Sequence, residues 1–142
     1  MIYIDTSSLL KLAISDDQSS AVEIAVLTEP TIVISTLTDL ETSVQIKGMF
    51  LGGKITKSRM SRIRDDLGMI TSSTPFKKRK LSGRVFATAA TQHENAKTHC
   101  RSLDRLHLAA MEELQISRLM THDARQAEAA RELGYEVLSP GL

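Results

Sequence analysis

Four acidic residues stand where a parallel β-sheet would bring them together. Each lies just after a predicted strand or in the opening turns of a predicted helix: Asp5, Glu41, Asp104 and Asp123. The carboxyl ends of parallel strands share one edge of a sheet, and open α/β proteins bind their ligands at that edge. Carboxylates gathered there repel one another unless a cation neutralises them. Hard divalent cations such as Mg²⁺ and Mn²⁺ prefer such oxygen ligands.

A metal ion bound at this edge would activate water and offset the charge of phosphodiester hydrolysis. Each acid also has a simpler explanation. Asp5 and Asp123 can cap the helices that follow them, and Asp104 can complement a helix dipole. Asp39 competes with Glu41 for the site. Because two residues on a helix differ by about 200° of rotation, only one of them can face it, and Asp39 has a capping role available, which favours Glu41.

Alternating strand and helix patterns must position these acids. Apolar, β-branched runs predict strands at 2–4, 31–35, 118–121 and 135–138. Three-and-four spacing predicts helices at 7–13, 19–27, 36–50, 54–67, 81–92, 103–114 and 123–133. Thr36 is expected to cap the third helix, and residues 72–75 form a loop. This alternation is typical of an α/β fold with a central, mainly parallel sheet and helices on both faces.

Length and charge set further limits. The 142 residues are one domain's worth, so we expect a single domain over 1–142. Eighteen Lys and Arg against seventeen Asp and Glu give no bulk-charge indication of nucleic acid or membrane. Residues 54–84, however, contain ten basic residues and only two acids. That basic stretch can follow an RNA backbone, or it can be a solvated helix face and a loop.

The sequence says less about the cellular compartment and about metals other than Mg²⁺ and Mn²⁺. The single cysteine, Cys100, cannot form an intramolecular disulfide, which favours a reducing, cytoplasmic location. We find no signal peptide at the N-terminus and no apolar run long enough for a membrane span. His93, His99 and Cys100 lack a fourth ligand at usable spacing, so a zinc site is not expected.

Several segments around the acids resemble segments of one protein family and follow one another in the same order along the chain. They are Tyr3–Lys11, Ser35–Glu41, Leu103–Ala110, Leu119–Asp123 and the tail Gln126–Leu138. Together these segments resemble the PIN domains, and within them the VapC-type toxins of bacterial and archaeal toxin-antitoxin pairs. The resemblance covers about half of the chain, and its strength lies in the ordered set of segments.

The resemblance implies a PIN-like three-layer α/β/α sandwich and a Mg²⁺- or Mn²⁺-dependent endoribonuclease. In such proteins the acids that match Asp5, Glu41, Asp104 and Asp123 hold one or two metal ions, supported by the hydroxyls that match Thr6, Ser7 and Thr121. It also implies a cognate antitoxin and a homodimer. Some relatives carry a further acid shortly after the last one, but residues 124–127 contain none, so a fully furnished second metal site is not expected.

Two other functions stay open on the residues alone. One is a phosphate-ester hydrolase for small molecules, although Ser7 stands where the second acid of an Asp-x-Asp motif belongs. The other is a non-catalytic module that binds RNA or protein, in which the four acids are only helix caps and surface charges. Metal-dependent stabilisation would distinguish the nuclease from such a module.

Overall fold

Five short parallel strands form one sheet in the computed structural model, which describes residues 1–142. The strand order is β3-β2-β1-β4-β5, and every neighbouring pair is parallel. The strands are β1 (Ile2–Ile4), β2 (Ile32–Ser35), β3 (Phe76–Arg79), β4 (Arg118–Met120) and β5 (Glu136–Leu138). The predicted α/β class with a parallel sheet is confirmed.

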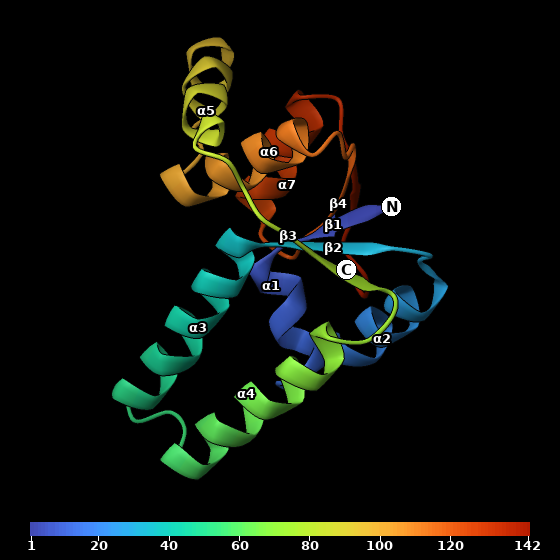
Figure 1. Cartoon of the computed structure of the whole chain (residues 1–142), viewed down its shortest axis with the longest axis vertical. Coiled ribbons are helices and arrows are strands. Elements are labelled where there is room, and N and C mark those ends of the chain that lie inside the picture. The colour runs from blue at the N-terminus through green and yellow to red at the C-terminus, as the bar shows by residue number, and fades with distance from the viewer.

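Helices cover both faces of the sheet. Helices α1 to α4 lie on one side and α5 to α7 on the other, with α3 and α4 forming a long antiparallel pair (Figure 1). Their bounds are α1 (Thr6–Leu9), α2 (Ser19–Thr28), α3 (Thr36–Leu51), α4 (Lys57–Thr71), α5 (Arg84–Asn95), α6 (Ser102–Glu113) and α7 (Ala124–Glu132). A 3₁₀ turn, η1 (Leu10–Leu12), follows α1. The predicted three-layer sandwich is therefore confirmed.

The protein has two hydrophobic cores, one on each face of the sheet, because side chains alternate between the faces along each strand. Side chains of successive strand residues point to opposite faces, so Ile2 and Ile4 of β1 join the core under α1 to α4, whereas Tyr3 joins the core under α5 to α7. All three side chains are fully buried. Burying an Ile side chain contributes about 1.5–3 kcal/mol, which holds this short strand at the centre of the sheet.

Strand β3 was not predicted. Its sequence is basic, with Phe76 buried and Lys77 to Arg79 exposed. Backbone pairing with β2 in parallel register makes it a strand. It lies at the edge of the sheet, where exposed lysines discourage pairing with other chains.

The cap of α3 also differs from the prediction. Ser35, not Thr36, is the N-cap, and its hydroxyl accepts a hydrogen bond from the Thr38 amide at 3.3 Å. Asp39 forms an ion pair with Lys78 of β3 at 3.3 Å. Ser35 has the extended backbone that an N-cap requires, because it is still paired in β2.

The chain order creates a switch point beside β1. From β1 the chain builds β2 and β3 on one side and then returns to build β4 and β5 on the other. In open α/β sheets the carboxyl ends of strands at such a point border a crevice. Here that edge carries Asp5 after β1 and Thr121 after β4.

None of the helices combines the length and apolar character that crossing a membrane would need.

Candidate active site

Asp5 is the most enclosed of the four acids, with 3% of its surface exposed. Thr121 donates to its Oδ2 at 2.6 Å, Ser7 donates to the carboxylate at 2.8 Å, and the Ser8 amide donates to Oδ1 at 3.0 Å. Burial raises the pKa of Asp5, although these hydrogen bonds oppose the shift. No Lys or Arg side chain pairs with it. The Ser8 contact also makes Asp5 the N-cap of α1.

Glu41 lies on the face of α3 that meets α1 and α6. Its Oε2 accepts a hydrogen bond from Thr6 at 3.2 Å and from Nε2 of His107. Burial alone would raise the pKa of Glu41, but the hydrogen bonds from His107 and Thr6 oppose this shift, and the pKa is lowered. Asp39, the alternative on this helix, points to Lys78 instead.

His107 connects Glu41 to the sheet. Its Nδ1 lies 2.7 Å from the Tyr3 hydroxyl, which in turn lies 2.6 Å from the Ser35 hydroxyl. Donors and acceptors match when Tyr3 donates to Nδ1 and the Nε2 proton is donated to Glu41. Burial raises the pKa of Tyr3 far above its usual value, so the phenol remains a donor. No local pattern in the sequence indicates this partnership of His107 with Glu41, which lies 66 residues away in the chain.

Arg101 bridges the remaining two acids. Its Nε donates to Oδ2 of Asp104 at 2.7 Å, and its Nη2 donates to Oδ2 of Asp123 at 2.7 Å. Asp104 is nearly buried in the first turn of α6, whereas Asp123 is the N-cap of α7 and accepts the amides of Arg125 and Gln126. A guanidinium thus stands between two carboxylates at the sheet edge.

The three predicted supporting hydroxyls all contact acids of the site. Thr6 binds Glu41, while Ser7 and Thr121 bind Asp5. The Asp123 amide also donates to Thr121 at 3.0 Å. His122, by contrast, does not face the acids, because its ring is held by Ser8 and the Pro140 carbonyl.

Residues of the site fit a hard divalent cation by their chemistry. All four acids present oxygen ligands at the same sheet edge, and a cation, the Arg101 guanidinium, already lies between two of them. No three His, Cys, Asp or Glu side chains, however, converge on one point as the side chains stand. Binding a metal ion to more than two of these acids would therefore require Arg101 and at least one carboxylate to move.

Arg101 could have been found from the sequence. It precedes Asp104 by three residues, a spacing that places two side chains on the same side of a helix start. Tyr3 and His107 carry no comparable local signal, since their partners are 32 and 66 residues away in the chain.

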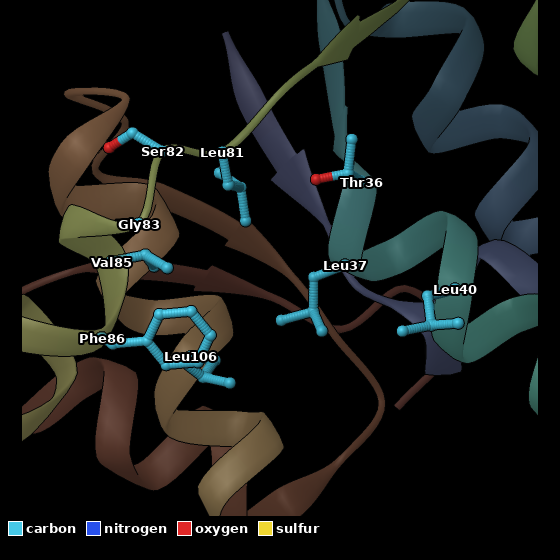
Figure 2. A pocket seen from close by; sticks show the side chains of 9 residues that line it. All are labelled: Thr36, Leu37, Leu40, Leu81, Ser82, Gly83, Val85, Phe86 and Leu106. Carbon is cyan, nitrogen blue, oxygen red and sulfur yellow. The ribbon is translucent and has the colours of Figure 1, made fainter.

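An apolar groove of about 350 Å³ lies beside the acids. Leu37 and Leu40 of α3 form one side, and Val85 and Phe86 of α5 form the other (Figure 2). Leu40 and Phe86 are 61% and 65% exposed. Leu40 precedes Glu41, so this apolar surface adjoins the carboxylate edge.

Solved structures share this fold over nearly the whole chain. VapC20 from Mycobacterium tuberculosis, described as a Sarcin-Ricin loop cleaving toxin, superposes with a TM-score of 0.73 at 15% identity, covering 99% of this chain and 100% of that one. FitAcB from Neisseria gonorrhoeae gives 0.74 at 17% identity, covering 99% and 98%. VapBC2 from Rickettsia felis, bound to a promoter DNA fragment, gives 0.69 at 15% identity, covering 97% and 98%.

These likenesses define the class: an α/β sandwich with the same architecture as these proteins. The family model described as "PIN domain" matches residues 2–132, and the chain belongs to the PIN domain family. No curated protein matches its sequence.

Proposed function

We propose that this PIN domain is a metal-dependent endoribonuclease and the toxin of a type II toxin-antitoxin pair. The observation that carries the proposal is that four acids lie at the carboxyl edge of a PIN sheet: Asp5, Glu41, Asp104 and Asp123. Hydroxyl groups of neighbouring residues donate hydrogen bonds to two of them, Asp5 and Glu41. The likeness to VapC20, a toxin described as cleaving the Sarcin-Ricin loop, supports RNA as the substrate. An RNA substrate implies a cytoplasmic activity.

Asp5, Glu41, Asp104 and Asp123 would hold Mg²⁺ or Mn²⁺. When bound, the ion supplies a water nucleophile and offsets charge on the phosphate. Thr121, Ser7 and the Ser8 amide orient the Asp5 carboxylate, so its position does not depend on the metal. Thr6 and His107 do the same for Glu41. Preorganised ligands of this kind lose little entropy when the reaction begins.

Arg101 would leave the Asp104 and Asp123 carboxylates when they bind the ion. The guanidinium is 57% exposed, so it can turn outward without disturbing the core. A planar fork of donors then stands at the rim of the site, where it can pair with a phosphate oxygen. This side chain therefore serves as the counter-ion of the metal-free site.

A cognate antitoxin and a homodimer are part of the proposal. Solved structures with this fold include VapBC2 and FitAB, both bound to DNA fragments. In this chain the apolar groove between α3 and α5 offers a protein partner a surface next to the acids. An antitoxin segment seated there would cover the approach to Glu41.

Cleavage of RNA by the purified protein tests the proposal. A mixed set of structured and unstructured RNAs would be incubated with Mg²⁺, Mn²⁺ or EDTA, beside Asp5→Asn prepared in the same way. We expect cleavage that requires metal and disappears in the variant. An Asp5→Asn protein with full activity would contradict the assignment of the site.

One observation favours a second function, a non-catalytic RNA- or protein-binding module. Asp5 and Asp123 both serve as helix N-caps, and no three potential ligands converge. Thermal unfolding with Mn²⁺ separates the two functions, because an ion that binds the folded state must raise the Tm. A Tm that Mn²⁺ does not change, with no cleavage of any RNA, would favour the binding module.

A further inference from the structure

Arg105 of α6 is a buried cation without a partner. Only 4% of its surface is exposed, and its Nε and Nη2 are buried and form no hydrogen bond. Its side chain takes part in none of the ion pairs of the structure. Burying an unpaired charge is costly, and proteins normally satisfy it with a counter-ion or with hydrogen bonds. The Nε and Nη2 donors of Arg105 are therefore available to bind an anion.

The two acids that line a cavity together with Arg105 already accept other hydrogen bonds. Glu112 accepts a hydrogen bond from Gln92 at 2.6 Å. Glu132 accepts the amide and hydroxyl of Thr98, together with the Lys97 amide. Both acids line a cavity that Arg105 also borders, but neither comes within ion-pair distance of it. No carboxylate of the chain therefore forms an ion pair with Arg105.

Arg105 also borders a second cavity, of about 680 Å³, between α5 and α6. Its ionisable lining consists of His93, His99, Cys100, Arg101 and Arg105, with no Asp or Glu. Arg101, which bridges Asp104 and Asp123, forms the wall toward the acids. The cavity is thus a basic pocket that opens directly beside the candidate active site.

We propose that this cavity is a phosphate-binding subsite, in which Arg105 and Arg101 hold an RNA phosphate next to the one that is cleaved. Arginine suits this role because its fork of donors matches two phosphate oxygens. Phe86, Ala89 and Leu106 line the same cavity, and apolar surroundings strengthen the attraction between a guanidinium and an anion. The RNA assignment rests on the proposed nuclease function, whereas the phosphate site does not.

Phosphate binding is measured on metal-free protein in EDTA, which keeps it independent of catalysis. Thermal unfolding is compared in inorganic phosphate and in chloride at equal ionic strength, for the wild type, Arg105→Met and Arg131→Met. Arg131 is an exposed arginine of α7 that borders neither cavity. We expect phosphate to raise the Tm of the wild type and of Arg131→Met. In Arg105→Met the affinity should fall about ten- to hundredfold, as for loss of a charged hydrogen bond.

The variant itself distinguishes a binding role from a structural one. Replacing an unpaired buried charge by an apolar side chain of similar length should leave the Tm in chloride unchanged or higher. If Arg105→Met fails to fold, Arg105→Lys keeps the charge but lacks the fork, and its phosphate affinity should fall. Equal phosphate stabilisation in the wild type and the Arg105 variants, or none in either, would overturn the subsite.

A second arm asks whether the phosphate belongs to RNA. In the Asp5→Asn background with EDTA, the affinity of a short labelled RNA is measured against salt concentration. Adding Arg105→Met should weaken binding and reduce the salt slope by about one phosphate contact, whereas Arg131→Met should not. RNA affinity that is unchanged by Arg105→Met, with free phosphate still bound, would overturn the RNA assignment. A change in dimerisation alone would assign Arg105 to a contact between copies and overturn the proposal.

Discussion

Replacing Arg101 by Gln should tighten metal binding. In the metal-free protein the guanidinium makes two contacts of 2.7 Å, one to Asp104 and one to Asp123. Because it is 57% exposed, solvent screens both contacts, and together they are worth about 1 kcal/mol. A divalent ion that takes these carboxylates must first displace Arg101. Removing the competitor should therefore lower the Kd for Mn²⁺ about fivefold.

Isothermal titration of Mn²⁺ into protein without RNA measures this effect. Arg125→Gln is the matched control, since it removes an exposed positive charge two residues after Asp123 that forms no ion pair. We also expect Arg101→Gln to lower the metal-free Tm by about 3 °C, because two carboxylates lose their cation. A Kd for Mn²⁺ that is unchanged or weaker in Arg101→Gln would refute the competition between guanidinium and metal.

Three further substitutions test the framework by urea unfolding. Tyr3→Phe leaves the buried Nδ1 of His107 without its donor and should lower the free energy of unfolding by about 1–2 kcal/mol. An unchanged free energy of unfolding would show that this hydrogen bond does not stabilise the fold. Arg118 binds the nearly buried Glu29 carboxylate through two 2.8 Å contacts. Arg118→Met leaves this carboxylate unpaired and should lower the free energy of unfolding by about 2 kcal/mol. Thr42 has a buried hydroxyl without a partner, so Thr42→Val should stabilise by about 1 kcal/mol, and a loss of stability would mean that an ordered water serves it.

Strands that are apolar by composition were predictable, and the basic edge strand was not. Ile2 to Ile4 and Ile32 to Ser35 are buried on both faces, which requires the continuous apolar runs that the sequence displays. Phe76 to Arg79 needs only one buried residue, because an edge strand is half exposed. Its strand character comes from hydrogen bonds to β2, and no local pattern in a basic segment signals them.

Placement of the acids followed from chain order, since residues beyond parallel strands or at the start of returning helices share one edge of the sheet. Asp5 and Asp123 can therefore be assigned to that edge from the order of strands and helices alone. The choice of Glu41 over Asp39 rested on helix rotation, and in the structure Glu41 faces Thr6 while Asp39 faces Lys78. Their role in metal binding stays a prediction.

The partners of Glu41 and Asp123 were decided only by tertiary structure. His107 reaches Glu41 across 66 residues, and Arg101 reaches Asp123 across 22. Arg105 is buried without a partner, although its local sequence resembles an ordinary helix turn. Sequence spacing determines the face of an element on which a side chain lies. The distance between two faces depends on how helices pack over the sheet, and that packing sums many weak contacts from distant parts of the chain.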